Sequence, residues 1–280
     1  MPKTILITGA SSGIGAATAA YFHERGWNVV ATMRKPADGA ALAQLENVLV
    51  ARLDVLDEDS IAAAVAAGLA RFGAIDVLLN NAGYGAYGVL EATPMATIRR
   101  QFDVNVFGLL AVTKAVLPHM RARGQGTIIN ISSVGGRMTY PLGTLYHGSK
   151  WAVEGLSEAL SFELGPLGIR VKLVEPGGVR TDFAGRSFEF TNDPALAEYQ
   201  PLVEGLLAAQ ENVDYSAHQT PREVAERILE AATDERDRLR YISGEGAKSL
   251  LASRRAGDEE EFLADMKRRF GLTIPTRAPE

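Results

Sequence analysis

The sequence predicts an α/β protein with a doubly wound parallel sheet, and three observations lead to this prediction. Seven short runs rich in apolar and β-branched residues alternate with longer segments of helical character. The runs are continuously apolar, as in Val77-Leu78-Leu79 and Ile128-Ile129, and a glycine-rich turn at residues 8–15 directly follows the first of them. Alternating strands and helices favour a parallel sheet with crossover helices, and continuously apolar strands suit a sheet that helices cover on both faces.

The seven predicted strands span residues 4–8, 28–32, 48–53, 75–79, 126–131, 170–175 and 240–243. No Pro-, Gly- or Ser-rich linker separates two halves of the chain, and no repeat of solenoid period is present. We therefore expect a single domain over residues 1–280, a length sufficient to bury a large core.

The helices between these strands carry recognisable start and stop signals. The first runs from the glycine turn to about Arg25, and the alanine-rich stretch 61–70 ends at Phe72-Gly73, a typical helix stop. Long helices are expected near residues 97–120 and 146–164. A Thr-Pro-Arg-Glu sequence at 220–223 begins another helix, and segment 258–269 has acids at its start and bases at its end, as a last helix would.

Segment 182–219 interrupts the alternation with scattered aromatic residues among polar ones. It follows the sixth strand and leaves the sheet on the carboxyl side, where ligands bind in open α/β sheets. A long insertion at this edge is usually functional, so we interpret it as a substrate lid. The tail, residues 272–280, is expected to be mobile or to dock on a neighbouring subunit.

The composition argues against several kinds of partner. The net charge of -5 offers no surplus of bases for nucleic acid or an anionic membrane surface, and the chain contains no cysteine. The first apolar run is followed at once by the glycine turn, which leaves no room for a signal peptide, and no apolar stretch is long enough to span a membrane. The four histidines lack metal-ligand spacing. We expect a soluble, cytoplasmic protein without a metal.

The glycine turn reads Thr8-Gly9-Ala10-Ser11-Ser12-Gly13-Ile14-Gly15. It lies between a strand and a helix, where backbone amides and a helix N-terminus can meet a pyrophosphate. Farther along the chain, Tyr146 and Lys150 are four residues apart and share one helix face. An ammonium beside a phenol favours the phenolate electrostatically, so Tyr146 is a candidate general acid and base.

These motifs resemble the short-chain dehydrogenase/reductase family when the other elements are added in order. The chain has Asn80-Asn81-Ala82-Gly83 after the fourth strand, then Asn105, then Ile131-Ser132-Ser133, Tyr146-x-x-x-Lys150 and Pro176-Gly177-Gly178-Val179-Arg180-Thr181. The glycine spacing G-x-x-x-G-x-G also matches this family rather than the more usual G-x-G-x-x-G. The resemblance covers residues 8–181 and implies a Rossmann fold, a nicotinamide cofactor and transfer of a hydride.

The resemblance also implies individual roles. Ser133 would hydrogen-bond the substrate oxygen, Tyr146 would exchange the proton, and Lys150 would hold the nicotinamide ribose and lower the pKa of Tyr146. Asn105 would anchor a water of a proton relay. The residues implied in cofactor binding are Gly9, Ser11, Ser12, Gly13, Ile14, Gly15, Arg34, Asp54, Val55, Asn81, Gly83, Tyr146, Lys150, Pro176, Gly177, Val179 and Thr181.

The end of the second strand bears on the choice between NAD and NADP. An acid there would bind a free ribose hydroxyl and repel a phosphate. Met33 stands where NAD-preferring relatives carry an aspartate, and Arg34 follows it. A guanidinium can pair with the adenosine phosphate of NADP, with Ser11 or Ser12 assisting, so we expect NADP(H) to be preferred over NAD(H).

The function expected is that of an NADP-dependent ketoreductase or alcohol dehydrogenase. Apolar and aromatic loop residues favour a small lipophilic carbonyl compound or alcohol, and the sequence looks most like the hydroxysteroid and retinol dehydrogenase branch. These apolar and aromatic loop residues are Tyr84, Tyr87, Met138, Tyr140, Pro141, Leu142, Leu145, Phe183, Phe188 and Phe190. The alternative is a non-catalytic NADP-binding sensor or scaffold; the glycine spacing disfavours a nucleotide-sugar epimerase, and dehydration or dehalogenation stays open. The family also implies a homodimer or homotetramer.

Overall fold

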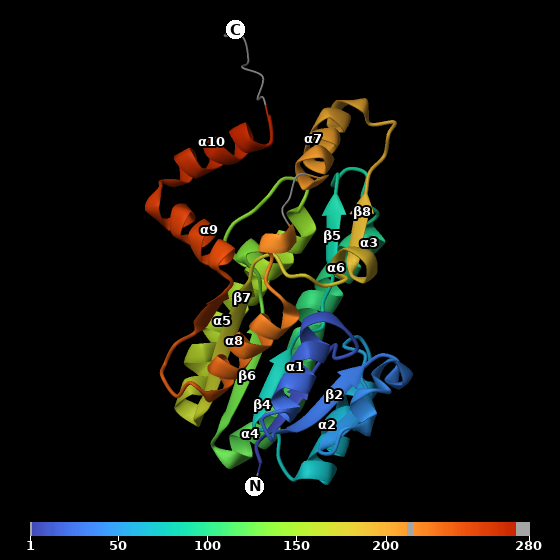
Figure 1. Ribbon diagram of the computed structural model, residues 1–280, viewed down its shortest axis with the longest axis vertical. Coiled ribbons are helices and arrows are strands. Elements are labelled where there is room, and N and C mark those ends of the chain that lie inside the picture. Colours follow the sequence, from blue (N-terminus) through green and yellow to red (C-terminus); the bar gives the residue numbers. More distant parts are fainter. Residues whose placement is uncertain (1, 212–214, 273–280) are drawn as a thin grey trace.

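The computed structural model describes residues 2–211 and 215–272 and has a seven-stranded parallel sheet at its centre (Figure 1). Its strand order is β3-β2-β1-β4-β6-β7-β9, in which the chain starts near the middle and winds outward in both directions. The strands are β1 (Thr4–Ile7), β2 (Asn28–Met33), β3 (Val48–Arg52), β4 (Val77–Asn80), β6 (Gly126–Ile131), β7 (Ile169–Pro176) and β9 (Arg240–Ser243). The seven predicted strands and their doubly wound parallel arrangement are confirmed.

Helices cover both faces of the sheet, as the composition of its strands predicts. All residues of β1, β2 and β4 are buried. One core cluster joins the sheet to α1 (Gly13–His23) and α8 (Pro221–Thr233) and includes Phe22 and Ile228. A second cluster joins the opposite face to α2 (Glu58–Phe72) and α4 (Leu109–Arg123) through Ile61 and Val116.

Three helices begin or end at the signals recognised in the sequence. Helix α2 ends at Gly73, which has a left-handed φ of 79°. Helix α8 begins with a complete capping box, in which Thr220 and Glu223 satisfy each other's backbone N–H groups. Helix α10 (Glu259–Arg269) is capped by the Asp258 side chain, which accepts a hydrogen bond from the Glu261 backbone. Helix α9 (Glu245–Ala256) precedes it.

The segment expected as one helix near residues 97–120 is divided. Helix α3 (Met95–Phe102) leads into a π-helical turn, Asp103–Gly108, and only then into α4. Gly108 closes the turn, and a Cβ atom there would lie 2.7 Å from a methyl group of Val55, so the widened turn packs tightly on the loop after β3. The apolar periodicity of the sequence carries no sign of such a turn. Helix α5 (Thr144–Leu164) is continuous.

A second, two-stranded parallel sheet was not predicted. It pairs β5 (Gly85–Gly88) with β8 (Phe188–Thr191), which are about a hundred residues apart in the chain. Both strands are short, and Gly88 has a φ of 128° and no room for a side chain, since a Cβ atom would lie 2.0 Å from the Thr191 carbonyl oxygen. The sheet lies beyond one end of the main sheet, near α6 (Phe183–Arg186) and α7 (Gln200–Glu211) (Figure 1).

No helix in the two described segments is long and apolar enough to cross a bilayer. The tail for which mobility or docking is expected falls, apart from Leu272, outside the described residues.

Candidate active site

A cavity of about 840 Å³ brings together most of the residues singled out in the sequence. It is lined by loops at the carboxyl ends of β1, β2, β3, β4, β6 and β7. The predicted site residues among its lining are Gly9, Ser11, Ser12, Gly13, Ile14, Arg34, Asp54, Val55, Asn81, Gly83, Ser133, Tyr146, Lys150, Pro176, Gly177, Val179 and Thr181. Gly15 and Asn105 belong to the predicted set but do not line it.

The glycine turn has the geometry that a dinucleotide requires. Gly9 and Gly13 have φ values of 70° and 55°, which favour glycine. Gly15 lies beneath the turn, because a Cβ atom there would come within 2.3 Å of the Gly9 carbonyl oxygen. The side chain of Ser12 makes no capping hydrogen bond at the start of α1, whose first residues line the cavity. This helix N-terminus and turn fit a pyrophosphate group.

Thr8 and Asn81 hold the glycine turn against the end of β4. The Thr8 hydroxyl oxygen accepts hydrogen bonds from the backbone N–H groups of Asn81 and Ala82, both at 3.0 Å. The Asn81 side chain donates to the carbonyl oxygens of Thr8 at 2.9 Å and Gly9 at 3.2 Å. The Asn81 amide therefore acts mainly as a brace for the turn, which its sequence motif did not reveal.

The cavity extends to the ends of β2 and β3. Arg34 is exposed there, and among the described residues it makes no ion pair. Met33 before it is buried. The carboxylate of Asp54, after β3, accepts a hydrogen bond from the Leu56 backbone at 3.1 Å. The cationic side chain at this end of the cavity is thus available to an anionic group.

Ser133, Tyr146 and Lys150 meet at the other side of the cavity. Lys150 is buried, its Nζ donates to the Ile131 carbonyl oxygen at 2.9 Å, and Nζ lies 5.8 Å from the centre of the Tyr146 ring. Burial lowers the pKa of Lys150 to about 8, while the negative charge of Glu154 raises it. The Ser133 oxygen accepts a hydrogen bond from the Gly135 backbone at 3.0 Å.

The expected lowering of the Tyr146 pKa is not seen in the protein alone. Burial raises the pKa of this phenol, and the opposing influence is a hydrogen bond with Ser133 rather than the charge of Lys150. The physical reason is desolvation, since removing a phenolate from water disfavours the charged form. Helical spacing brings the two side chains to one face but does not report how deeply they are buried.

Asn105 lies behind the cavity wall. Its side-chain oxygen accepts from the Tyr84 backbone N–H at 3.0 Å, and its Nδ2 donates to the Tyr84 carbonyl at 2.8 Å and to Ser149 at 3.2 Å. Gln101, which sequence reasoning missed, braces the same loop by donating to the Tyr84 carbonyl at 3.0 Å and accepting from the Ala86 N–H. No local signal distinguishes this glutamine from other helix amides. The relay role of Asn105 stays a prediction.

Aromatic side chains form the wall beside Tyr146. Tyr87 stacks on the Tyr146 ring with centroids 5.3 Å apart, and Phe188 lies 5.2 Å from Tyr87. Phe183 contacts Tyr146 edge to face at 6.2 Å, and Phe190 stacks on Phe188 at 6.3 Å. Of the loop residues expected around a lipophilic substrate, Tyr84, Tyr87, Phe183 and Phe188 line the cavity, whereas Met138, Tyr140, Pro141, Leu142, Leu145 and Phe190 do not.

His147, next to Tyr146, holds a loop rather than a ligand. One ring nitrogen, Nδ1, lies 3.0 Å from the Gly135 carbonyl oxygen, and the other accepts from the Tyr140 backbone N–H at 3.2 Å. These partners select the tautomer with hydrogen on Nδ1. Burial lowers the pKa of His147. The neutral ring therefore fixes the loop that follows Ser133.

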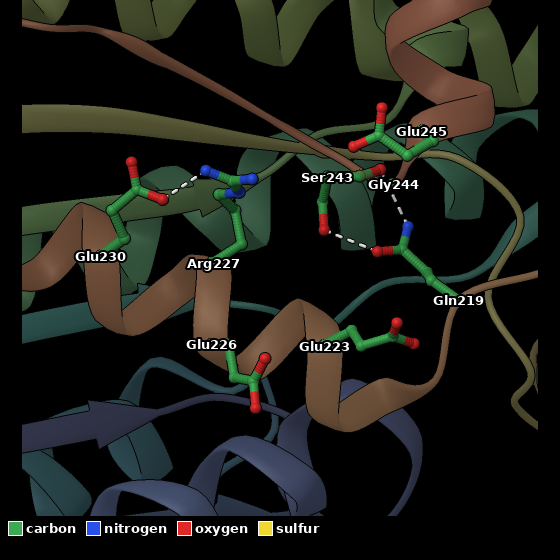
Figure 2. A pocket seen from close by; sticks show the side chains of 8 residues that line it. All are labelled: Gln219, Glu223, Glu226, Arg227, Glu230, Ser243, Gly244 and Glu245. Carbon is green, nitrogen blue, oxygen red and sulfur yellow. Dashed lines mark hydrogen bonds and ion pairs between the residues drawn. The ribbon is translucent and has the colours of Figure 1, made fainter.

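A second cavity, of about 290 Å³, lies between α8 and the start of α9 (Figure 2). The Gln219 side chain donates to the Ser243 carbonyl oxygen at 2.9 Å, and the Ser243 hydroxyl donates to the Gln219 side-chain oxygen at 2.6 Å. Arg227 forms an ion pair with Glu230. Figure 2 shows Glu223, Glu226 and Glu245 around the same space. The buried polar groups here satisfy one another, as in a structural crevice.

Comparison with known proteins agrees with this geometry. A family model described as short chain dehydrogenase matches residues 3–192. Retinol dehydrogenase 8 of Bos taurus is 37% identical over 270 residues, which cover 90% of this chain and 84% of that protein. The crystal structure of a short-chain dehydrogenase from Streptomyces avermitilis superposes with a TM-score of 0.81 and 34% identity, covering 98% of this chain and 100% of that one.

Two further solved structures hold a nicotinamide cofactor. ElxO with NADP bound superposes with a TM-score of 0.73 at 27% identity, covering 89% of this chain and 100% of that one. A 3-ketoacyl-(acyl-carrier-protein) reductase from Brucella melitensis complexed with NADH has the same TM-score at 25% identity, with 88% and 98% covered. The chain described here belongs to the short-chain dehydrogenase family and is an oxidoreductase that acts on CH–OH or C=O groups with a nicotinamide cofactor.

Proposed function

We propose that the protein is an NADP-dependent ketoreductase or alcohol dehydrogenase for small lipophilic carbonyl compounds and secondary alcohols. One observation carries this proposal. Ser133, Tyr146 and Lys150 share a single cavity with the glycine turn and Arg34, and aromatic side chains form the cavity wall next to Tyr146. A non-catalytic binding protein would have no need for the proton-exchanging group that this arrangement provides.

In the proposed mechanism, the substrate oxygen is held by the Ser133 hydroxyl and the Tyr146 phenol. In reduction, Tyr146 donates its proton to this oxygen, and in oxidation it takes the proton back. The Lys150 ammonium, fixed on the Ile131 carbonyl, supplies positive charge near the phenol and a donor for the cofactor ribose. When bound, the nicotinamide supplies the hydride chemistry, and the glycine turn, Asp54, Val55, Asn81, Gly83 and the loop 176–181 would hold the cofactor.

The preference for NADP(H) rests on Arg34. Its exposed guanidinium lines the cavity next to the glycine turn, and Ser11 and Ser12 are also part of the lining. No acid at the end of β2 competes for the ribose hydroxyl. Arg34→Asp should weaken NADPH binding about 10- to 100-fold and NADH binding far less, because the loss is that of a charged hydrogen bond. Fluorescence titration with both cofactors measures this, and equal losses would contradict the assignment.

The substrate class is inferred from the aromatic wall. Tyr87 and Phe183 contact the Tyr146 ring, and Phe188 packs on Tyr87. The apolar groups of a carbonyl substrate held at Tyr146 would be buried against these rings. Two of the three, Phe183 and Phe188, come from segment 182–219. This supports our interpretation of the segment as a lid that covers the substrate.

We also propose that the protein is a homodimer or homotetramer. Large apolar side chains are exposed on the helices that the family implies in self-association: Phe107 in the π-helical turn and Trp151 and Phe162 on α5, with 61%, 47% and 74% of their surface exposed. Exposed apolar side chains of this size along one pair of helices favour contact with a second subunit.

The test of the proposed function compares the wild type with Tyr146→Phe. NADPH oxidation is followed with a panel of lipophilic ketones and aldehydes, and NADH serves as the cofactor control. The phenylalanine retains the ring contacts but has no proton to donate, so turnover should fall about 100- to 10,000-fold while NADPH binding persists. If wild type binds NADPH tightly but turns over no member of the panel, the sensor or scaffold alternative gains support.

A further inference from the structure

A cluster of buried charges lies behind Lys150, away from the cavity. Glu154, on α5, and Glu175, on β7, have only 4% and 0% of their surface exposed. Their partners are Arg137, which follows the turn Val134–Gly136, and Arg240, on β9. Charged side chains are rarely buried unless they are paired, so four elements from distant parts of the chain meet here at a considerable desolvation cost.

Arg240 connects the two carboxylates. Its Nε donates to Glu154 at 2.9 Å and lies 3.6 Å from Glu175, whose same oxygen accepts from Arg137 at 3.0 Å. The Nη2 of Arg240 reaches outward to Glu158 at 2.6 Å. Arg240 thus binds two glutamates of α5 through two different nitrogens, one glutamate buried and one with half of its side chain exposed.

Glu154 is the member of this cluster that lies one helical turn from Lys150. It follows Lys150 by four residues, so both side chains lie on one face of α5. Its side chain packs at Gly136, where an added Cβ atom would lie 2.9 Å from the Glu154 Cγ and 3.1 Å from the Lys150 carbonyl oxygen. The Glu154 Oε1 atom is buried and accepts no hydrogen bond from any described residue. Among the described residues, Arg240 therefore satisfies one oxygen of this carboxylate and nothing donates to the other.

We propose that Glu154 is a positioning residue for Lys150, a buried carboxylate that keeps the neighbouring ammonium protonated from the side of α5 that does not face the cavity. This inference rests on the proposed role of Lys150. Arg240 holds the Glu154 carboxylate in place and also lies 3.6 Å from Glu175, and none of these three residues lines the cavity.

The pKa shifts of the buried groups have the direction that this role requires. Burial lowers the pKa of Lys150 to about 8, and Glu154 is the group that opposes this shift. Without the Glu154 charge the pKa of Lys150 would fall further, and the ammonium would be lost nearer neutral pH. Burial and the charge of Glu154 also raise the pKa of Glu175 to about 7. The charged and titratable groups around the pair are Tyr146, Glu158, Arg137, Glu175 and Arg240.

Glu158 offers a matched control. Glu154→Gln and Glu158→Gln each remove one negative charge from α5 and weaken one bond to Arg240. Glu158 is exposed and a further turn away from Lys150. If Glu154 only anchors Arg240, the two substitutions should act alike; if it acts on Lys150, they should not.

The first readout is the titration of Lys150 itself, independent of any substrate. The chain has seven lysines, so NMR of protein with 13C-labelled lysine side chains gives a simple spectrum in which Lys150→Arg identifies the Lys150 signal. We expect Glu154→Gln to lower the Lys150 pKa by about 0.5 to 1 and Glu158→Gln to leave it unchanged. The signal of Lys172, buried elsewhere, serves as an internal control and should not move.

Glu154→Asp keeps the negative charge on a side chain that is one methylene shorter. The pKa of Lys150 should therefore fall by less than in Glu154→Gln. This variant also carries the test if Glu154→Gln does not fold, which circular dichroism will show. The proposal is overturned if the Lys150 pKa is unchanged in the folded Glu154 variants, or if Glu158→Gln lowers it equally.

The second readout is the pH dependence of NADPH-dependent reduction. The alkaline limb of kcat/KM should move to lower pH in Glu154→Gln by the same amount as the Lys150 pKa, and Glu154→Asp should largely restore it. If the NMR shift is found but no substrate is turned over by the wild type, the role of Glu154 stands and the proposed reductase function fails. If the wild type turns over substrate normally and the Lys150 pKa does not move in the Glu154 variants, the proposed reductase function stands and the role of Glu154 fails.

Discussion

Within the described residues, two buried lysines each lie beside a tyrosine ring, and one of these two pairs faces the active-site cavity. Lys150 lies 5.8 Å from the centre of the Tyr146 ring, and Lys172 lies 5.4 Å from the centre of the Tyr241 ring. Both lysines are buried, and burial lowers the pKa of each. By residue type, by separation and by the burial of the lysine the two pairs are nearly equivalent, yet the proposed chemistry belongs to the first alone.

The difference lies in what the polar atoms already bind. Lys172 donates to the Arg236 carbonyl at 2.7 Å and to the Tyr241 hydroxyl at 3.1 Å, and that hydroxyl donates to Asp234 at 2.9 Å. Tyr241 is fully buried. Tyr146, in contrast, lines the cavity beside Ser133 and remains partly exposed to it. A satisfied pair stabilises the fold, whereas a pair whose phenol faces open space can exchange a proton with a ligand.

Replacing the two lysines gives the sharpest contrast. Lys150→Met should lower kcat/KM for carbonyl reduction about 100-fold or more, because it removes the charge beside the proposed acid. Lys172→Met should leave kcat/KM within about twofold, because Lys172 does not line the cavity. Steady-state kinetics with NADPH on both purified variants measures this. A comparable loss in both variants would mean that the buried pair of Lys172 on β7 and Tyr241 on β9 also supports catalysis.

Replacing the two tyrosines should affect stability in the opposite order, with the larger loss at Tyr241, outside the cavity. Tyr241→Phe removes a hydroxyl that links Lys172 to Asp234, and we expect the free energy of unfolding to fall by about 1 to 3 kcal/mol because buried partners lose a hydrogen bond. Tyr146→Phe should cost less, since this side chain lines the cavity. Urea unfolding followed by circular dichroism provides the comparison. Equal stability of the two variants would argue against a stabilising role for the Tyr241 hydroxyl between Lys172 and Asp234.

The smallest expected effect is the fall of kcat/KM for reduction as the pH becomes alkaline. The Lys150 ammonium is present below its pKa of about 8 and is lost as the pH rises through that value, so kcat/KM for reduction should be roughly half its neutral plateau near pH 8. Burial raises the Tyr146 pKa, so the phenol keeps its proton over this range. A pH profile measures the limb. Any activity left in Lys150→Arg, which stays charged, should lack the limb, and a limb that persists would assign it to another group.

Much of the site followed from local sequence. The glycine turn, the four-residue spacing of Tyr146 and Lys150, and the order of the later motifs lead to one cavity, because parallel strands direct their carboxyl ends to one edge of the sheet. The seven strands and the capping box at Thr220 also depend on neighbours in the chain. The small sheet of β5 and β8 could not be predicted, since each short strand needs a partner about a hundred residues away.

The sequence by itself determined the fold class, the family and the side chains that share the face of α5, because periodicity and motif spacing are local properties of a chain. Only the tertiary structure decided that the Tyr146 pKa is raised rather than lowered and that Asn105 and Asn81 brace loops. It also brought Glu154 and Glu175 behind Lys150 with Arg240 between them. The physical reason is desolvation: the energy of a buried charge depends on residues that the chain brings together from far apart, and no short motif contains them.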